Sequence, residues 1–478
     1  MNGTAAPNRW LVLLSMTGSL SMILLDQTVV TVALPSMARD LHLSAGGQQW
    51  VVSTYVLTMA AVVALGGKLG DRFGGVPVFK VGVTVFFVAS ALCGLAPTGE
   101  WGEIWIIAAR SAQGLGAAMM MPVSAAIVVS SFAVEERGRA MAVYAGVSQV
   151  FLAIGPLVGG LLTESVTWRA VFWLNIPVGI AALVLVQIAK PVSHPAPDSR
   201  IQIGSVVLLV TGVGATVLGI QQSSSWSWGS PLTLGLILGG VAVLTLFTVL
   251  QLHSDNPLIQ VRLFGERPFL GDLVVLAFLQ FGLLAVVLYS SLFFQDLLHM
   301  SPVRAGAATM PLVISLAIAA QLGGRWYDRA GVRPPVLTGM AVASVGLVAW
   351  CVALPRLDYA WQLPGMVLTG FGIGLVMSPG NTDALSRASL RYRSQAAGLV
   401  QTVRQLGGTL GVAVIGSIVL GLEEGGSTSQ DPDAAAHAIT VGFGVAAASF
   451  VIAVVAGWFL LSHQRISDDG PAIPAPSG

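Results

Sequence analysis

Charged residues are scarce in this 478-residue chain. Asp, Glu, Lys and Arg make up 9% of the sequence, whereas 55% of the residues are hydrophobic. A soluble chain of this composition would expose a large apolar surface to water, so we expect a lipid bilayer to be its solvent. The net charge of +1 gives no basic face for phosphates, so nucleic acid is not expected as a partner.

Three kinds of functional motif are also missing. The two cysteines, Cys93 and Cys351, each lie in an apolar run, so no disulfide framework is indicated. No G-x-x-x-x-G-K-[ST] sequence is present to hold ATP phosphates, and the six histidines are scattered. We therefore expect no enzymatic activity, no catalytic residue, no metal site and no cofactor.

Long apolar runs, in contrast, fill the sequence. A helix needs about 20 mostly apolar residues to cross roughly 30 Å of hydrocarbon, and runs of this length recur along the chain. They predict an all-α integral membrane protein with about fourteen transmembrane helices. The predicted spans are 10–36, 48–68, 76–97, 103–131, 138–163, 169–189, 201–221, 231–251, 268–296, 304–325, 334–354, 362–386, 394–421 and 438–462.

A short charged motif occurs twice in gaps between these runs. G-K-L-G-D-R-F-G extends from Gly67 to Gly74, and G-R-W-Y-D-R-A-G extends from Gly324 to Gly331. Asp71 and Asp328 are 257 positions apart, which corresponds to an even number of helices. Both copies then lie on one side of the membrane, so we expect a parallel repeat of two bundles.

The repeat predicts two pseudo-symmetric six-helix bundles with two additional helices inserted between them. The sequence from Lys190 to Arg200 is rich in Pro and marks the end of the first bundle. The polar, Pro-rich C-terminal segment is predicted to be a disordered cytoplasmic tail. The expected domains are residues 1–196 (first bundle), 197–256 (inserted helices), 257–463 (second bundle) and 464–478 (tail).

Lys and Arg are distributed unequally between the two sides. Seventeen of the 23 lie on the side that carries both motifs, and only Arg39, Arg169, Arg304 and Arg356 lie on the other. Positively charged loops stay in the cytoplasm. We therefore expect a multi-pass protein of the inner (cytoplasmic) membrane, with both termini in the cytoplasm.

An acid and a base lie at similar depth in the first and fourth predicted spans. Asp26 is costly within hydrocarbon unless it is paired or protonated, and Arg110 lies within about a turn of its depth. Protonation of Asp26 would remove the partner of Arg110, so the pair could couple proton binding to a conformational change. The alternative is a permanent salt bridge that only fastens the two helices together.

The repeated motif suggests a conformational gate. Asp71 and Asp328 can cap helix ends, and Arg72 and Arg329 can bridge neighbouring helices. The alternative is a tight turn that anchors the loop on the positive side. The expected gate residues are Gly67, Asp71, Arg72, Gly74, Asp328 and Arg329.

Polar and small residues within other spans suggest a cavity and close helix packing. Arg404 must face water or an acid, and Asp383 is a candidate partner. Small residues let backbones approach, and Pro permits a kink; both occur together at Gly155, Pro156, Gly159 and Gly160. The candidate cavity residues are Gln27, Gln113, Gln149, Gln280, Tyr289, Gln401, Arg404 and Gln405.

These motifs together resemble the major facilitator superfamily, and within it the fourteen-helix group of drug:proton antiporters. The resemblance is carried by L-D-Q-T-V-V-T-V-A-L-P (Leu25 to Pro35), R-S-A-Q-G-L-G-A-A (Arg110 to Ala118), G-P-L-V-G-G (Gly155 to Gly160) and W-R-A-V-F-W-L-N-I-P (Trp168 to Pro177). It implies proton coupling at Asp26 and Arg110, and an antiporter motif at Gly155. The basic pair usual after Gly74 is replaced by Gly75 and Val76, which leaves Lys80 as a candidate substitute.

The function expected from this sequence is proton-coupled antiport that exports amphiphilic organic compounds or drugs by alternating access. The expected partners are the lipid bilayer, protons and a small-molecule substrate, with the chain acting as a monomer. Two alternatives remain: a dedicated exporter of one endogenous metabolite, and a membrane scaffold or receptor that transports nothing. The proton motive force would supply the energy for either kind of exporter.

Overall fold

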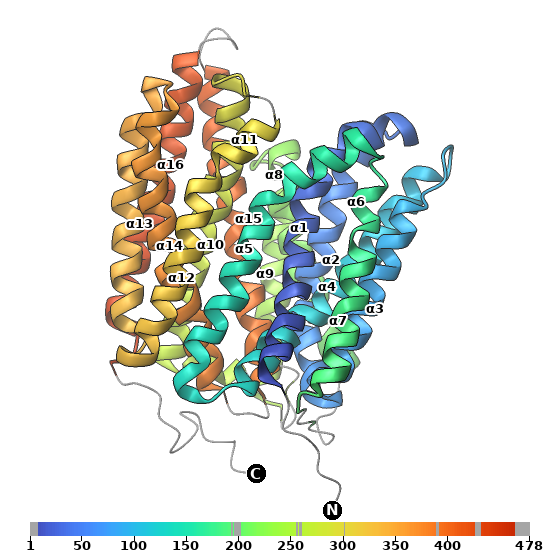
Figure 1. Ribbon diagram of the computed structural model, residues 1–478, viewed down its shortest axis with the longest axis vertical. Coiled ribbons are helices and arrows are strands. Elements are labelled where there is room, and N and C mark those ends of the chain that lie inside the picture. The colour runs from blue at the N-terminus through green and yellow to red at the C-terminus, as the bar shows by residue number, and fades with distance from the viewer. Residues whose placement is uncertain are drawn as a thin grey trace, which may run out of the picture.

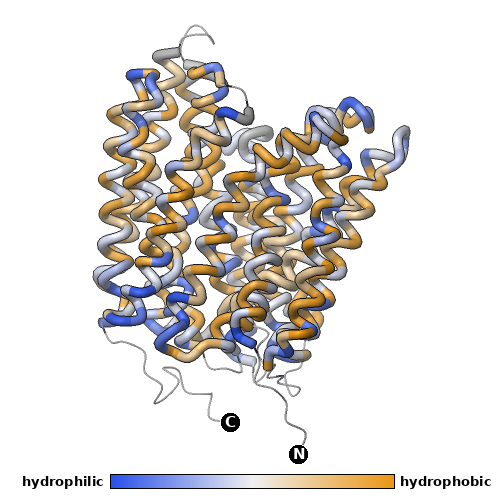
Figure 2. The backbone as a smooth tube through the Cα atoms, in the orientation of Figure 1, coloured by the Kyte–Doolittle hydropathy of each residue, from blue (hydrophilic) through white to orange (hydrophobic). Residues whose placement is uncertain are grey.

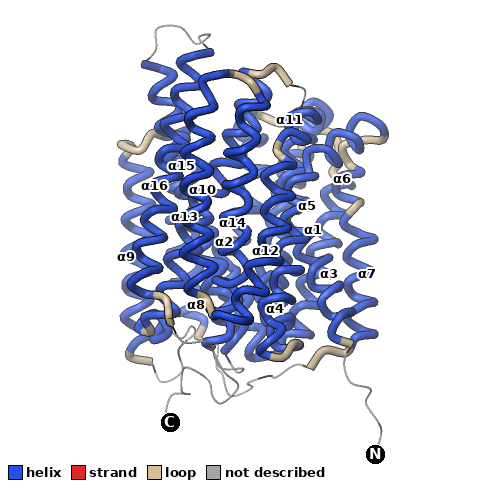
Figure 3. Tube along the Cα trace, turned by 60° about the vertical axis from the view of Figure 1, so that its left-hand side comes forward, coloured by secondary structure: helices blue, strands red, loops and turns tan. Residues whose placement is uncertain are grey.

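The computed structural model describes residues 8–192, 202–254, 261–300, 302–388, 392–425 and 432–463, together with Pro195 and Pro257. These residues form helices and no strand (Figure 3). The predicted tail, 464–478, lies outside the described residues.

The short helices α6 (Ala170–Trp173) and α11 (Pro302–Ala308) lead into α7 and α12. The longer helices are α1 (Arg9–Leu41), α2 (Ala45–Phe73), α3 (Gly75–Gly94), α4 (Gly102–Ser131), α5 (Arg137–Ser165), α7 (Asn175–Ala189), α8 (Ile203–Trp226), α9 (Pro231–Leu252), α10 (Arg267–Leu292), α12 (Met310–Ala330), α13 (Arg333–Ala353), α14 (Tyr359–Arg387), α15 (Arg393–Gly425) and α16 (Pro432–Leu460).

The helices form two bundles side by side (Figure 1). Helices α1–α7 make the N-terminal bundle and α10–α16 the C-terminal bundle, while α8 packs against α2 and α15 and pairs with α9. Helix α1 begins and α16 ends at the same end of the molecule, which we call the terminal end; the opposite end is the far end. Apolar residues cover the length of the helices and hydrophilic residues gather at both ends (Figure 2), as a bilayer requires.

The length and composition of the helices confirm a multi-pass membrane protein. Twelve helical segments among the described residues are long and apolar enough to cross a bilayer, and there are thirteen if the two segments of the bent α5 are counted as one span. Helix α12 is not among them, so fourteen spans remain a prediction. The ends of several helices are set by capping: the side chains of Asn8 and Ser44 accept hydrogen bonds from backbone N–H groups in the first turns of α1 and α2.

Glycines bring helix backbones into contact at equivalent places in the two bundles. Helices α3 and α4 cross where a methyl group added to Gly82 would lie 3.0 Å from the carbonyl oxygen of Gly116. Helices α13 and α14 cross where a methyl group added to Gly339 would lie 2.7 Å from the carbonyl oxygen of Gly372. Gly82 and Gly339 are 257 positions apart, the same offset as the two charged motifs. The bundles therefore repeat in their packing as well as in their sequence.

The chain bends by 46° within α5, between the segment Val134–Leu152, which begins in the short turn before this helix, and the segment Leu157–Ser165. Pro156 lies at this break, where its missing N–H removes one hydrogen bond of the helix. Beside it, Gly155 and Gly159 pack on α1: methyl groups added there would lie 3.3 Å and 2.9 Å from the backbone of Val29. Gly160 is buried as well. This glycine and proline sequence therefore bends α5 and packs it closely against α1.

Candidate functional site

The first charged motif joins the two bundles at the terminal end. The carboxylate of Asp71, near the end of α2, accepts hydrogen bonds from the backbone N–H groups of Ser394 (3.0 Å) and Gln395 (2.9 Å) in the first turn of α15. These groups have no partner within their own helix, and they carry the positive end of its dipole. Gly67, one turn earlier in α2, lies directly against the carbonyl of Ser394 and leaves no room for a side chain.

The second motif makes the same contact in the opposite direction. The carboxylate of Asp328, in α12, accepts hydrogen bonds from the backbone N–H groups of Gly138 (2.9 Å) and Arg139 (3.2 Å) in the first turn of α5. Gly324 lies against the carbonyl of Gly138, which also accepts a hydrogen bond from the Ser378 hydroxyl of α14 at 2.8 Å. We call the two contacts the Asp71 latch and the Asp328 latch.

The repeat holds for the details of both latches. Helices α5 and α15 begin at Arg137 and Arg393, so each aspartate binds the second and third residues of its partner helix. The final glycine of each motif, Gly74 and Gly331, ends its helix with a positive φ of 94° and 78°. Glycine adopts this conformation without steric cost.

The basic residues near the motifs do not form the latches. The guanidinium of Arg72 stacks over Phe73, and Arg329 is exposed. The expectation that these arginines bridge the helices is wrong, because the partner helices present N–H donors that only an acceptor can bind. Lys80, the candidate substitute for the basic pair, donates instead to Gln187 of α7 at 2.5 Å, within its own bundle.

A cavity lies between the bundles and is lined by α1, α4 and α5 from one bundle and by α10, α14 and α15 from the other. It contains about 690 Å³ of empty space, including space open to solvent. Its apolar lining includes Met121, Met141 and Met377, flexible side chains that adapt to varied shapes. Six of the predicted cavity residues line it: Gln27, Gln149, Gln280, Gln401, Arg404 and Gln405.

Two predicted cavity residues are not among those that line it. Gln113 points into the N-terminal bundle, where its amide donates to Asp26 at 2.7 Å and to Ser90 at 3.2 Å. The hydroxyl of Tyr289 lies over Gly416 of α15. The polarity of a residue within a span predicts a place in the cavity, but it does not distinguish the helix face toward the cavity from the face toward a neighbouring helix.

Arg404 is the single charged side chain among the described residues that line the cavity. Its guanidinium donates to the side-chain oxygen of Gln280 at 3.0 and 3.3 Å and to that of Gln401 at 3.4 Å. Asp383, the candidate partner, is bound to Arg387 at 2.6 Å, so that pairing is wrong. Neutral amides therefore orient Arg404 and leave its positive charge in the cavity.

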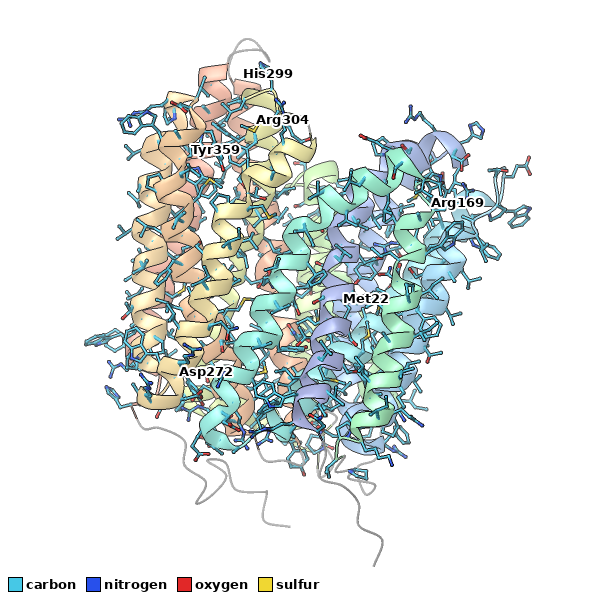
Figure 4. All side chains as sticks on the ribbon, viewed as in Figure 1. Met22, Arg169, Asp272, His299, Arg304 and Tyr359 are labelled. Carbon is cyan, nitrogen blue, oxygen red and sulfur yellow. The ribbon has the colours of Figure 1, made fainter. Side chains whose placement is uncertain are left out.

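Asp26 and Arg110 form a buried ion pair in the N-terminal bundle, with 2.5 Å between Oδ2 and Nη1. The second carboxylate oxygen accepts hydrogen bonds from Gln113 (2.7 Å) and Asn175 (3.0 Å). The guanidinium lies 4.3 Å from the ring centre of Tyr55. Met22, one turn before Asp26 in α1, lies near the middle of the bundle (Figure 4). Asp26 is not a cavity-lining residue, although its neighbour Gln27 is.

Two polar residues of the cavity and one buried acid outside it are not among the residues expected from the sequence. Tyr144 and Asn381 line the cavity. Asp272, in the first turns of α10, is fully buried. A polar residue inside an apolar run was a usable signal for Tyr144 and Asn381. Asp272 lies close to the predicted start of its span, where an acid is expected to reach water.

The chain matches the model of the Major Facilitator Superfamily over residues 16–412 and belongs to that family. It is therefore a membrane transporter. The relatives include the puromycin resistance protein pur8 of Streptomyces alboniger, which is 31% identical over 97% of this chain and 93% of its own length. The tetracenomycin C resistance and export protein of Streptomyces glaucescens is 33% identical over 86% of this chain and 76% of its own length.

A solved structure supports the fold. The proton:xylose symporter XylE superposes with a TM-score of 0.66 over 95% of this chain and 96% of its own, at 14% sequence identity. That similarity establishes the architecture of two bundles. Together with the relatives named for antibiotic resistance and export, it confirms the family resemblance seen in the sequence motifs.

Proposed function

We propose that this chain exports amphiphilic organic compounds, including drugs, across the cytoplasmic membrane in exchange for protons. The main support for this proposal is a cavity lined by both bundles, together with two latches that join those bundles at one end. Latches made of a few hydrogen bonds can break and reform, as alternating access requires. The names of the relatives, which refer to puromycin resistance and tetracenomycin C export, support an exporter of such compounds.

In this proposal the terminal end faces the cytoplasm, and the conformation is closed on that side. The excess of Lys and Arg in the loops of this end supports the orientation. The domain limits follow the repeat, with residues 197–256 as an insertion between bundles 1–196 and 257–463. Breaking both latches would open the cavity to the cytoplasm.

Proton coupling is proposed at Asp26 and Arg110. Their charges compensate each other in a site 1% exposed, so a proton arriving on Asp26 would leave Arg110 as an uncompensated buried charge. The bundle would then favour a different arrangement of α1 and α4. One charge that moves through 100 mV releases about 2.3 kcal/mol, enough for a substrate gradient of roughly 50-fold.

The cavity supports neutral or anionic substrates over organic cations. Arg404 repels a cation, and no carboxylate among the described residues lines the cavity to attract one. The amides of Gln149, Gln401 and Gln405 and the hydroxyl of Tyr144 can bind oxygen-rich groups, while the methionines accept apolar rings. We therefore propose acidic or neutral amphiphiles with several polar oxygens as the substrate class.

A dedicated exporter of one compound is the second candidate. Both relatives described above are named for a single antibiotic, which supports a narrow specificity for this chain as well. A broad exporter and a dedicated one share every structural feature above and differ in the range of compounds moved.

Transport by purified protein in sealed proteoliposomes tests the proposal. With an imposed pH gradient, we expect uptake of an acidic or neutral amphiphile such as tetracenomycin C against a concentration gradient, and substrate-dependent proton flux in the opposite direction. A panel of acidic, neutral and cationic amphiphiles distinguishes a broad exporter from a dedicated one. Folded protein that moves neither substrate nor protons would contradict export and would favour a membrane scaffold.

A further inference from the structure

A second cluster of buried charges lies in the C-terminal bundle, apart from Asp26. It consists of Asp272 from α10, Asp383 and Arg387 from α14, and Tyr327 from α12. The Nε of Arg387 lies 2.6 Å from Asp383 Oδ2 and 3.6 Å from Asp272 Oδ2, and the Tyr327 hydroxyl donates to Asp383 Oδ1 at 3.3 Å. Figure 4 shows Asp272 close to the terminal end, on the side of the C-terminal bundle.

The charges of this cluster do not balance. Two carboxyl groups face one guanidinium, and the exposed fractions of the three side chains are 0% for Asp272, 2% for Asp383 and 8% for Arg387. With both acids ionised, the cluster would hold a net negative charge in a dry interior, which is strongly unfavourable. The Asp26 site, in contrast, contains one carboxylate and one guanidinium.

The lack of hydrogen bonds at the Asp272 carboxyl group indicates how the charge of the cluster is balanced. Neither of its carboxyl oxygens accepts a hydrogen bond, although both are buried, and Nη2 of Arg387 also has no hydrogen-bond partner. The carboxyl groups of Asp272 and Asp383 lie near each other, because both approach the same nitrogen, Nε of Arg387. Two ionised carboxylates would repel at this range, whereas a proton on one lets it donate to the other.

We propose that Asp272 and Asp383 hold one proton between them, so that the C-terminal bundle contains a proton-binding site distinct from Asp26. Among the described side chains, the groups that act on this carboxyl pair are Arg387 and Tyr327. A metal cation does not fit, because Arg387 would repel it. The described residues also contain no group of three or more His, Cys, Asp or Glu side chains arranged to hold a metal.

The position of the site gives the proton a route. Helices α10 and α14 carry Gln280, Met377 and Asn381, which line the cavity, and Ser378 of α14 belongs to the Asp328 latch. The carboxyl pair thus lies on the two helices that connect the cavity with the latched end. When the latches open, water reaches the pair and accepts the proton on that side. This use in transport rests on the proposed function, whereas the presence of the proton does not.

Infrared difference spectroscopy on purified protein in lipid nanodiscs tests the site directly, because a protonated carboxyl group has its own C=O absorption. We expect wild-type protein to show such a band at neutral pH and to lose it when the pH is raised. Asp272→Asn and Asp383→Asn should each remove the contribution of one protonated carboxyl group from this absorption, because each leaves one carboxylate paired with Arg387. The control, Asp40→Asn at the far end, should keep this contribution.

The single substitutions leave a balanced pair, so both variants should fold, and either one suffices for the test. Arg387→Gln gives a complementary check, because removal of the guanidinium should add one protonated carboxyl group to the spectrum. An absorption of unchanged intensity in the Asp272 and Asp383 variants, or no band in wild-type protein, would overturn the proposal.

Proton flux per substrate in proteoliposomes tests the role in transport. We expect one proton fewer per substrate in Asp272→Asn than in wild-type protein. An unchanged ratio, with the infrared contribution lost, would leave a structural proton and overturn the proposed route. Wild-type protein that transports nothing would refute the exporter, while the infrared result would still decide whether the proton is present.

Discussion

Asp71 and Asp328 bind the first turns of α15 and α5 through the same pair of carboxylate contacts, each to a helix of the opposite bundle. The two residues are 257 positions apart and belong to equivalent helices, α2 and α12. The latches therefore cross-link the bundles reciprocally: each bundle supplies one carboxylate and one helix terminus. Such an arrangement closes both sides of the terminal end together.

Replacing Asp71 by Ala should weaken this closure. A capping carboxylate contributes about 1 kcal/mol, so the open population should rise roughly fivefold. Distances between spin labels at the terminal ends of α2 and α15 report the change. Asp328→Ala should act in the same direction, and the double substitution should act more strongly than either alone.

Asp358→Ala is the matched control for the latch variants. Asp358 caps α14 within its own bundle, where Oδ1 accepts the N–H of Ala360 at 2.9 Å. Its loss should reduce local helix stability to a similar degree without changing the label distances. Equal shifts in Asp358→Ala and Asp71→Ala would refute the latch role.

Substitutions at the ion pair of Asp26 and Arg110 can distinguish a role in proton coupling from a role that only fastens α1 to α4. Asp26→Asn should destabilise the protein by about 3–5 kcal/mol, because it leaves Arg110 buried without a counter-charge. The double variant Asp26→Asn/Arg110→Gln removes both charges and should recover thermal stability. We expect it to remain unable to couple efflux to a pH gradient in proteoliposomes.

Recovery of proton-driven efflux together with stability would show that the pair only fastens α1 to α4. The pair of Asp40 and Arg169 at the far end is a suitable control, because both side chains are partly exposed. Removing both charges there should change stability by less than about 1 kcal/mol.

Arg404 should determine the preference for substrate charge. Loss of a hydrogen bond to a charged group typically costs about 1.5–3 kcal/mol, so Arg404→Gln should raise the KM for an acidic substrate roughly tenfold or more. The methyl ester of the same compound should be affected little. Arg404→Lys retains the charge and should lie closer to wild type for the acid. An equal loss for acid and ester in Arg404→Gln would indicate a packing role instead.

Gly372 should not tolerate a larger residue. A methyl group at this position would lie 2.7 Å from Cα of Ala343, so Gly372→Ala requires the backbones of α13 and α14 to separate. Overpacking of this kind typically costs about 1–3 kcal/mol, which a thermal unfolding assay in detergent can measure. Gly239→Ala in α9 is the control, because the added methyl group meets no atom within 4 Å. Its stability should be unchanged or slightly raised.

The fold was predictable because apolar length and the positions of Lys and Arg are local properties of the sequence. The gate aspartates were also visible, since Asp71 and Asp328 recur at a fixed offset. Their partners were not, because they are backbone N–H groups as far as 324 positions away, and such groups carry no residue-type signal. Bridging by Arg72 and Arg329 was expected from charge alone, which ignored what the opposite helix presents.

The ion pair of Asp26 and Arg110 followed from their similar depth in two spans. The depth of a residue within a span does not tell which way its side chain points. Gln113 is therefore predicted to line the cavity, whereas its amide donates a hydrogen bond to Asp26. Asp272 lies at the start of the predicted span 268–296, a position where hydropathy does not indicate burial, whereas packing of α10 against α14 and α16 buries it. Burial at a helix end depends on tertiary packing, which a hydropathy pattern does not contain.

The glycine crossings of α3 with α4 and of α13 with α14 have a mechanical consequence. Backbones in direct contact at Gly82 and Gly339 cannot slide without collision, so each bundle should behave as a rigid body. The seams at α2 with α15 and at α5 with α12 are then where displacement is concentrated. If both bundles are rigid, the loss of a few hydrogen bonds at the membrane surface would displace the helices in the middle of the bilayer as well.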